Sequence, residues 1–396
     1  MPTGKDLLKA VRAEIREIKV ADVKRVVDAP GNGEKPIILD VREGEEVAEG
    51  HLPGAIALPR GFLELRIESK IPDKSTPVVV YCAGGNRSAF AARTLEEMGY
   101  GDVQSMAGGF GKWVEAGYAV VKPRSLTQLQ KQRYSRHLLI PEVGEAGQLK
   151  LLDAKVLLIG AGGLGAPAAL YLAAAGVGTL GIVDNDVVDM SNLQRQVIHT
   201  NDRVGKPKVE SARATIAGLN PDVNVVAHEL RLDVSNAVDI FSKYDVILDG
   251  TDNFATRYLI NDVCVHLGKP NVHGSVYRFE GQATVFAPKK GGPCYRCLYP
   301  LPPPPELAPS CADAGVLGIL PGIVGLLQST EVVKLILSAG NPLVGRLVMY
   351  DALKGTFREM RLQRDPDCPM CGDRAVFKGF EVYEQFCSDT FRAAAG

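Results

Sequence analysis

The chain has 396 residues, of which 46% are hydrophobic, and its 45 basic and 46 acidic side chains nearly cancel. This length exceeds the usual size of one hydrophobic core, so two domains are expected. No long run of one charge sign occurs, which argues against nucleic acids and membrane surfaces as partners and favours small-molecule or protein substrates.

Targeting and membrane signals are weak in this sequence. The N-terminal segment 1–18 is charged and amphipathic and lacks the apolar core of a signal peptide. The longest apolar stretches, 168–183 and 314–327, are interrupted by Gly or Pro and are shorter than the roughly 20 residues of a membrane helix. We therefore expect both stretches in the core and the protein in the cytoplasm. The eight cysteines are too sparse for a disulfide scaffold.

The first part of the chain alternates short apolar runs with a helical pattern. Parallel strands are predicted at 35–41, 76–82 and 103–108, with a helix over 88–99. This pattern predicts a small α/β domain over residues 1–122. The segment that follows is polar, and residues 123–132 are predicted to be a linker.

A second alternation of strands and helices fills residues 133–373. It predicts a doubly wound, Rossmann-like parallel sheet. The predicted strands are 155–162, 179–186, 224–231, 245–252 and 271–276, and the predicted helices are 164–176, 205–219 and 253–268. An antiparallel hairpin at 277–288 and a proline-rich surface loop at 299–311 are expected next. Residues 374–396 are predicted to be a C-terminal tail.

Cys82 ends a predicted strand and is followed by small residues and then by a predicted helix. Such a turn allows backbone N–H groups to face the sulfur, and the positive end of the helix adds to the effect. Both features favour a thiolate. The alternative is a buried structural cysteine at a strand end.

The length of this loop separates two kinds of chemistry. Only four residues separate Cys82 from Arg87, whereas cysteine-dependent phosphatases carry a Cys-x5-Arg loop. The motifs "CAGGNRS", "LDVRE", "EGHLPGAIALP" and "AGGFGKWVEAGY" occur in this order. Over about residues 15–122 the chain resembles the rhodanese sulfurtransferase modules. The resemblance implies a persulfide on Cys82, with Arg87 holding the terminal sulfur and with Asp40 and Arg42 supporting the loop.

A glycine-rich turn marks a nucleotide site in the second domain. Gly160, Gly162 and Gly165 have the Gly-x-Gly-x-x-Gly spacing between a strand and a helix, which permits close approach of the backbone to phosphates. Asp184 and Asp186 follow at the distance where a ribose hydroxyl is met in dinucleotide sites. Taken alone, this pattern would predict an NAD-dependent oxidoreductase.

Polar residues after the later strands favour a triphosphate instead. These residues are Asn192, Arg195, Lys208, Asp252 and Asn253. Arginine and lysine offset phosphate charge, and a carboxylate can hold Mg²⁺. The alternative is a set of helix caps and surface ion pairs.

Over about residues 128–373 the chain resembles the MoeB/ThiF adenylyltransferases, relatives of the ubiquitin-activating enzymes. The motifs are "SNLQRQ", "VGKPKVESA", "LDGTDN", "EGQATVF", "PCYRCLYP" and "LVMYDALKGTFREM". The resemblance implies that Asp186 holds the ribose of ATP, that Asn192, Arg195 and Lys208 hold its phosphates, and that Asp252 holds Mg²⁺. The motif "RYSRHLL" implies that Arg136 reaches the γ-phosphate of the ATP bound by a partner subunit, so a homodimer is expected. In this motif Ser135 replaces the family's usual Asn.

The remaining cysteines divide into pairs and single residues. Two Cys-x-x-Cys pairs, Cys294/Cys297 and Cys368/Cys371, match the ligand set of a structural zinc site; two disulfides or a redox pair are the alternatives. Cys311 lies where the MoeB/ThiF family has a cysteine and could resolve an acyl disulfide. Cys264 is expected in the core, and Cys387 carries no readable role.

Taken together, the two parts resemble the fused adenylyltransferase-sulfurtransferases, with the rhodanese module placed first instead of last. The resemblance implies ATP-dependent adenylation of a ubiquitin-like sulfur carrier ending in Gly-Gly, followed by sulfur transfer from Cys82 to form a thiocarboxylate. Such carriers serve molybdopterin, thiamine or cysteine biosynthesis. The sulfur donor would be a cysteine desulfurase or thiosulfate. The alternatives are an NAD oxidoreductase and a front module that only binds a partner.

Overall fold

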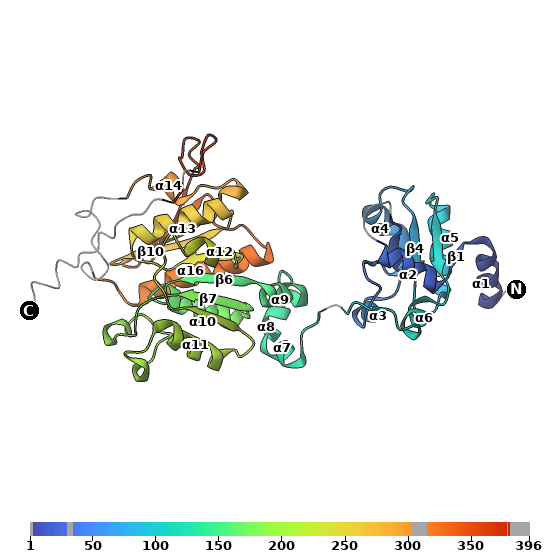
Figure 1. Ribbon diagram of the computed structural model, residues 1–396, viewed down its shortest axis with the longest axis horizontal. Helices are drawn as coiled ribbons and strands as arrows, with labels where there is room; N and C mark the ends of the chain where they lie inside the picture. Colours follow the sequence, from blue (N-terminus) through green and yellow to red (C-terminus); the bar gives the residue numbers. More distant parts are fainter. Residues whose placement is uncertain (1–2, 30–34, 123, 303–314, 378, 381–396) are drawn as a thin grey trace, which may run out of the picture. The chain divides into compact units, whose positions relative to one another are not determined.

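A computed structural model describes residues 3–29, 35–122, 124–302, 315–377 and 379–380. The chain divides into two compact units, Met1–Ser125 and Leu126–Gly396, which are described separately (Figure 1). The single cysteines Cys311 and Cys387 lie outside the described residues.

The first unit is built on a five-stranded parallel sheet in the order β1-β5-β4-β2-β3. Its strands are β1 (Glu17–Ile18), β2 (Ile37–Asp40), β3 (Ile56–Ala57), β4 (Val78–Tyr81) and β5 (Val103–Met106). Its helices are α1 (Gly4–Glu14), α2 (Val20–Asp28), α3 (Gly44–Ala48), α4 (Leu63–Lys70), α5 (Asn86–Glu97) and α6 (Gly109–Glu115). The three predicted strands and the predicted helix are confirmed; β1 and β3 are short additions at the two edges.

The central strand β4 shows why its sequence is apolar throughout. Val78 and Val80 pack into one hydrophobic cluster, whereas Val79 and Tyr81 pack into another on the opposite face. Successive side chains of a strand point to opposite faces, so a parallel strand covered by helices on both sides is apolar at every position.

The second unit holds an eight-stranded mixed sheet in the order β13-β12-β11-β10-β9-β6-β7-β8. Its strands are β6 (Lys155–Ile159), β7 (Thr179–Val183), β8 (Asn224–His228), β9 (Val246–Asp249), β10 (Asn271–Tyr277), β11 (Glu280–Phe286), β12 (Arg346–Asp351) and β13 (Thr356–Arg361). Strands β6 to β10 pair in parallel, and β10 to β13 form an antiparallel run. The doubly wound sheet is confirmed, and β12 and β13 extend it. An antiparallel hairpin is present, but it pairs β10 with β11, so the predicted segment 277–288 holds only its turn and its second strand.

Helices lie on both faces of this sheet (Figure 1). The α-helices described in this unit are α7 (Gln128–Arg133), α8 (Ser135–Leu138), α9 (Gly144–Asp153), α10 (Gly165–Ala175), α11 (Lys208–Leu219), α12 (Ala237–Phe241), α13 (Phe254–Leu267), α14 (Tyr295–Leu298) and α16 (Ile319–Leu337). Helix α7 begins inside the segment 123–132 that the sequence predicts as a linker. From β6 the chain runs outward through β7 and β8 and then returns to β9 on the other side, which creates a switch point at the carboxyl ends of β6 and β9.

Helix α16 contains the C-terminal part of the apolar stretch 314–327. By length and composition alone, this helix could cross a membrane, but half of its most apolar window is buried inside the unit. It packs against α10, β10 and β11. Its buried Gln328 donates hydrogen bonds to the carbonyls of Asp249 and Val272, at 2.7 and 2.9 Å. The helix therefore packs against the sheet as part of the core.

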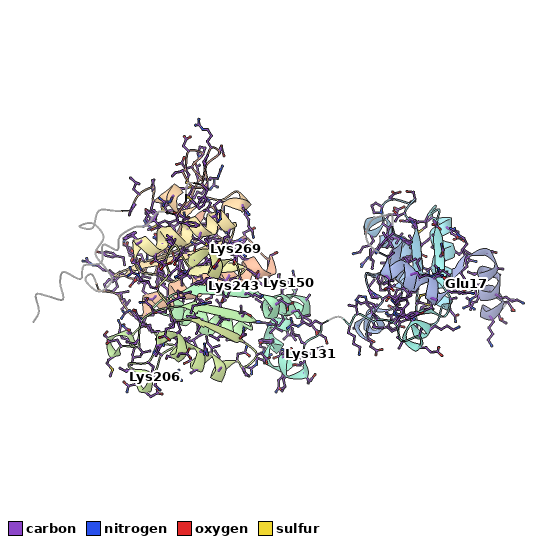
Figure 2. All side chains as sticks on the ribbon, in the orientation of Figure 1. Glu17, Lys131, Lys150, Lys206, Lys243 and Lys269 are labelled. Atoms are coloured by element: carbon purple, nitrogen blue, oxygen red, sulfur yellow. The ribbon has the colours of Figure 1, made fainter. Side chains whose placement is uncertain are left out.

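The surface charges come from many elements. The lysines labelled in Figure 2 for the second unit come from different elements, among them Lys131 on α7, Lys150 on α9 and Lys206 ahead of α11.

Candidate functional site

The sulfur of Cys82 lies buried at the end of β4, where the chain turns into α5. It accepts the backbone N–H groups of Gly85 at 3.2 Å and Ser88 at 3.4 Å. Gly85 has a φ of +93°, a conformation that favours glycine, and it caps the helix. The expected inward-facing N–H groups are therefore present, in a turn made possible by Gly85.

The glycine-rich segment that leads into α6 lies directly against this loop. Phe110 donates its N–H to the carbonyl of Cys82 at 2.7 Å, and Gly111 donates to that of Ala83 at 2.9 Å. A Cβ on Gly109 would lie 2.3 Å from the Cys82 carbonyl oxygen. Only glycine permits this approach, so the segment fixes the backbone of the cysteine loop.

Arg87 is held by a carboxylate that sequence analysis did not single out. Its two Nη atoms bond the two Oε atoms of Glu46 on α3, at 2.6 and 2.7 Å. These hydrogen bonds lower the pKa of Glu46 to about 2, although burial opposes the shift. The same bonds raise the pKa of Arg87, with a smaller contribution from Cys82. Arg87 thus stands beside the thiol as a permanent cation in a bidentate pair.

Asp40 and Arg42 form a buried ion pair, with 2.7 Å between Nη2 and Oδ2. Tyr81 donates its hydroxyl to Asp40 at 2.5 Å, and burial followed by the charge of Asp40 raises the pKa of Tyr81. The guanidinium also donates to the carbonyl of Glu46 at 3.1 Å and lies 4.0 Å from the centre of the Phe110 ring. The pair therefore links β2, β4 and α3 beneath the loop, which agrees with a supporting role.

A cavity of about 530 Å³ lies in the second unit at the carboxyl ends of β6, β7 and β9. Eight of the predicted nucleotide-binding residues line it, namely Gly160, Gly162, Asp184, Asp186, Arg195, Lys208, Asp252 and Asn253. Gly165 and Asn192 are not among its lining residues. The switch point of the sheet thus collects most of the predicted set.

The glycine turn is tightly packed. Gly160 has a φ of +96°, and a Cβ on Gly165 would lie 1.9 Å from the Gly160 carbonyl oxygen. Gly165 begins α10, so it allows the helix N-terminus to approach the strand end. The turn residues Gly162, Gly163 and Leu164 line the cavity just ahead of the helix, so their backbone N–H groups are the ones that can face phosphate oxygens there.

The two aspartates after β7 have different partners. Asp184 accepts the N–H groups of Ala161 at 2.8 Å and Asp186 at 2.9 Å, and burial raises its pKa. Asp186 forms an ion pair with Lys208 at 2.8 Å. Asp184 therefore stabilises the glycine turn. Asp186, which is predicted to bind ribose, and Lys208, which is predicted to bind phosphate, form an ion pair with each other.

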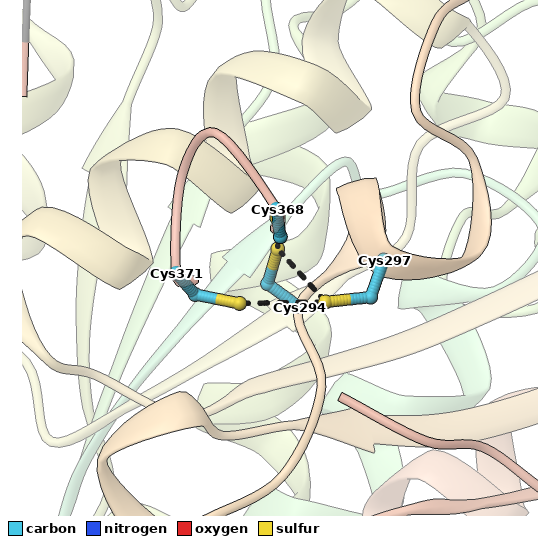
Figure 3. A group of neighbouring side chains, drawn as sticks. All are labelled: Cys294, Cys297, Cys368 and Cys371. Carbon is cyan, nitrogen blue, oxygen red and sulfur yellow. Dashed lines mark hydrogen bonds between the residues drawn. The ribbon is translucent and has the colours of Figure 1, made fainter. Parts of the chain in front are cut away.

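Four cysteine sulfurs meet beside α14, all within 4.8 Å of one another (Figure 3). The hydrogen-bonded pairs are 3.4 to 3.9 Å apart, close to the roughly 3.8 Å that a tetrahedron of Zn–S bonds requires. They are free thiols, and these separations are far longer than a disulfide bond of about 2.05 Å. The group, Cys294, Cys297, Cys368 and Cys371, could therefore hold a metal such as zinc.

The comparisons with known proteins identify both units. A model described as the ThiF family matches residues 134–370, and a rhodanese-like domain model matches residues 23–116. The chain belongs to the ThiF family. Residues 126–396 are hereafter the ThiF unit, and residues 1–125 are the rhodanese-like unit.

Three curated relatives of this ThiF-family chain are informative. It is similar to the adenylyltransferase/sulfurtransferase MoeZ of Mycobacterium tuberculosis, 55% identical over 285 residues that cover 70% of this chain and 71% of MoeZ. The SAMP-activating enzyme E1 of Haloferax volcanii is 55% identical over 252 residues, 64% of this chain and 93% of that enzyme. The sulfur carrier protein adenylyltransferase of Thermus thermophilus is 48% identical over 265 residues, 66% of this chain and 98% of that protein.

A solved structure supports the fold of the ThiF unit. MccB of E. coli with ATP gives a TM-score of 0.54 at 23% identity, over 62% of this chain and 75% of MccB. The predicted fold class and family resemblance are confirmed. The predicted enzyme class, an adenylyltransferase and sulfurtransferase, is confirmed by the curated relatives.

The other predicted residues of the ThiF unit lie as follows. Asn192 accepts the N–H of Arg195 at 3.0 Å, and Arg195 Nη1 donates to the carbonyl of Ser191 at 3.1 Å. Asn253 caps α13, because its side chain accepts the N–H of Thr256 at 2.9 Å. Of the polar residues predicted to bind the triphosphate, it is therefore one that also serves as a helix cap. Asp252 is exposed at the cavity.

Arg136 lies on α8 of the ThiF unit, where its side chain is exposed. It is not among the residues that line the cavity of its own subunit. Leu139 and Ile140, which follow it, are also exposed, at 73% and 44%. Cys264 is buried in the core, as expected, and burial raises its pKa far above the usual range.

A buried polar network that the sequence does not reveal lies behind the cavity. Arg257 lines the cavity and donates to the carbonyl of Thr251 at 2.9 Å. Asp249 accepts the N–H of Thr251 at 3.0 Å and meets His273 Nδ1 at 2.8 Å. Burial is the largest influence on Asp249 and opposes its ionisation, but the His273 hydrogen bond, the charges of His273 and Arg257 and the Thr251 hydrogen bond together outweigh it and lower the pKa. The only signal in the sequence was the occurrence of polar residues within apolar strands.

Proposed function

We propose that this chain uses ATP to adenylate the C-terminal glycine of a ubiquitin-like sulfur carrier and then transfers sulfur from a Cys82 persulfide to that carbonyl carbon. The product is a carrier thiocarboxylate. The observation that carries the proposal is the presence in one ThiF-family chain of a switch-point cavity lined by Arg195, Lys208 and Asp252 and of a buried, N–H-bonded Cys82. Two relatives, a SAMP-activating enzyme and a sulfur carrier protein adenylyltransferase, support the choice of substrate.

The adenylation step requires charge offset and alignment more than covalent help. A carboxylate oxygen of the carrier attacks the α-phosphorus of ATP, and pyrophosphate leaves with the electron pair of the broken bond. Asn192, Arg195 and Lys208 would hold the phosphates, and Asp186 would hold the ribose. The Lys208 ammonium is already fixed beside the cavity by its ion pair with Asp186. Asp252 would hold Mg²⁺, for which an exposed carboxylate at the cavity is a suitable ligand.

Sulfur transfer would use the anionic end of the persulfide. The terminal sulfur attacks the carbonyl carbon of the acyl-adenylate, a C–S bond forms, and AMP leaves. The thiolate of Cys311 then attacks the Cys82 sulfur, so that the thiocarboxylate leaves and a Cys82–Cys311 disulfide remains. A cellular dithiol reduces this disulfide, and a protein persulfide from a cysteine desulfurase or thiosulfate reloads Cys82. Arg87, fixed by Glu46, would hold the charge of the terminal sulfur.

The four-cysteine group would hold zinc as a structural ion without a part in either step, because four thiolates leave no open coordination position. The metal would fasten the segment around Cys368 and Cys371 to α14. A reducing cytoplasm would keep these thiols and Cys82 available.

The protein is also proposed to act as a homodimer in which Arg136 of one subunit serves the cavity of the other. Its exposure on α8 and its absence from the lining of its own cavity support this arrangement.

The test combines two measurements on the purified full chain. Carrier-dependent exchange of labelled pyrophosphate into ATP is expected, together with a mass gain on the carrier equal to the replacement of oxygen by sulfur. NAD reduction without pyrophosphate exchange would instead indicate an oxidoreductase. Cys82→Ala should keep the exchange and lose the mass gain; a variant that still forms thiocarboxylate at the normal rate would reduce the rhodanese-like unit to a binding module.

A further inference from the structure

Two serine side chains lie one behind the other beneath the sulfur of Cys82. The thiol of Cys82 lies 3.6 Å from Ser88 Oγ and is placed to donate to it. Ser105 on β5 donates its hydroxyl to Ser88 Oγ at 3.0 Å. Ser88 and Ser105 are both fully buried, and Cys82 is 1% exposed. The three groups therefore form a buried chain that leads from β5 to the nucleophile.

The position of Ser105 is set by the sheet. It pairs with Val80 in the register of β4 and β5, two residues before Cys82. A buried hydroxyl costs free energy unless it forms a hydrogen bond, and the partner of Ser105 is the Ser88 hydroxyl. The hydrogen bond to Ser88 therefore explains the presence of a serine inside this sheet better than packing does.

The direction of the hydrogen bonds matters when the sulfur becomes anionic. A hydroxyl donates one hydrogen and accepts two. Because Ser105 donates to Ser88, an acceptor position of Ser88 is filled, and the hydrogen of Ser88 can turn to the sulfur once Cys82 has lost its proton. The anion would then receive three donors, the N–H groups of Gly85 and Ser88 and the Ser88 hydroxyl. Linked hydroxyls of this kind strengthen each other.

We propose that Ser105 is a positioning residue for sulfur transfer, which orients the Ser88 hydroxyl to donate to the anionic sulfur of Cys82. The proposal rests on the proposed role of Cys82 as the sulfur acceptor. The charged groups near the loop are Arg87 with its partner Glu46, Arg12, which donates to Asn86 at 3.1 Å, and the buried Asp40–Arg42 ion pair. The Ser105 variants below leave all of these in place.

The test follows alkylation of Cys82 by iodoacetamide in the full chain, with the modified peptide measured by mass spectrometry. In Ser105→Ala, the rate at about pH 7 should fall roughly tenfold, the worth of one hydrogen bond to a charged group. At about pH 10, above the roughly 8.5 that is the ordinary pKa of a free cysteine thiol, the two rates should agree within about twofold. Ser105→Thr, which keeps the hydroxyl, should restore most of the rate at the lower pH.

A matched control separates this effect from loss of stability. Tyr100→Phe removes another buried hydroxyl of the same unit, which donates to the Ile71 carbonyl at 2.6 Å and does not touch the loop. It should lower stability without changing the alkylation rate at either pH. Equal rates for Ser105→Ala and wild type at about pH 7, or an equal fall in Tyr100→Phe, would overturn the proposal. If Ser105→Ala does not fold, Ser105→Thr and Ser105→Cys replace it. The thiol of the Cys variant is a weak donor, so equal rates of Cys82 alkylation in this variant and in wild type would likewise overturn the proposal.

A second assay keeps this inference distinct from the proposed function. If Cys82 has its proposed role, thiosulfate and cyanide should be converted to sulfite and thiocyanate through it, and Ser105→Ala should lower kcat about tenfold in this reaction with little change in KM. Carrier-dependent pyrophosphate exchange does not use Cys82 and should stay at the wild-type rate. A wild-type chain that forms neither thiocyanate nor thiocarboxylate would contradict the proposed function, while the alkylation result would still decide the role of Ser105.

Discussion

Lys208 and Asp186 form an ion pair at the nucleotide cavity, with 2.8 Å between Nζ and Oδ2. The two partners are unequally exposed, because 7% of the lysine side chain and 63% of the aspartate side chain reach solvent. The backbone joins them as well, since Lys208 donates its N–H to the Asp186 carbonyl at 2.9 Å. The carboxylate therefore fixes a mostly buried ammonium where phosphate oxygens are expected.

Lys208→Met should lower carrier-dependent pyrophosphate exchange by about a hundredfold or more, because a fixed cation at developing phosphate charge is worth several kcal/mol. Asp186→Asn should have a smaller effect, seen mainly in the KM for ATP. Lys206→Met is the matched control, since this exposed lysine lies two residues away and outside the cavity lining. A Lys208→Met enzyme with normal exchange would contradict the assignment.

Gly165→Ala should remove ATP binding and destabilise the ThiF unit, because the added Cβ would lie 1.9 Å from a backbone oxygen. Gly218 on α11 offers the control, since a Cβ there meets nothing within 4 Å. Gly218→Ala should stabilise the unit by about 0.5–1 kcal/mol. Thermal unfolding with and without ATP measures both effects, and a rise in melting temperature with ATP in Gly165→Ala would show that the turn tolerates a side chain.

Glu46 should make the stability of the rhodanese-like unit depend on acid pH. Its pKa is lowered from 4.5 to about 2 by the Arg87 pair. A carboxylate with a lowered pKa adds stability that is present above the unfolded value and is lost as pH falls from about 4.5 to about 2. Glu46→Gln should remove this part of the acid dependence, and Glu45→Gln, an exposed neighbour, should not.

The measurement can use a natural probe. The chain has one tryptophan, and Trp113 is buried in the rhodanese-like unit, so its fluorescence reports the unfolding of that unit alone. If the stability of wild type and of Glu46→Gln fell in the same way with decreasing pH, the Arg87 pair would not be the cause of the acid dependence.

Metal removal should destabilise the ThiF unit and leave the rhodanese-like unit unchanged. Structural zinc bound by four thiolates contributes on the order of 10 kcal/mol in small peptides. Purified protein should contain one zinc per chain by elemental analysis, and Cys297→Ser should lose it and melt at a lower temperature. Cys264→Ala removes a core thiol outside the cluster and should keep the metal. Full stability after complete chelation would exclude a structural metal.

The role of Arg136 can be tested by mixing two inactive variants. Arg136→Ala and Asp252→Ala should each lose pyrophosphate exchange as homodimers. After mixing under subunit exchange, half of the dimers carry one intact site, so about a quarter of the wild-type rate should return. A mixture that stays inactive although heterodimers are detected would place Arg136 and Asp252 in the same subunit's site.

The sequence by itself determined what depends on local spacing. The four residues between Cys82 and Arg87 distinguish a sulfur loop from a phosphate loop, and the glycine spacing at Gly160 to Gly165 identifies a strand-turn-helix nucleotide site. Such features can be recognised from the sequence because the backbone geometry of a short turn depends on the residues within it.

Only the tertiary structure decided which distant side chains become partners. Glu46 meets Arg87, Asp186 meets Lys208, and Ser105 meets Ser88 because helices and strands far apart in the chain are packed together. Asn253, a candidate ligand by sequence, caps α13 in the fold and also lines the cavity. Polar side chains look alike in a sequence, and their charges and hydrogen bonds acquire a role only when burial and sheet register supply the partner.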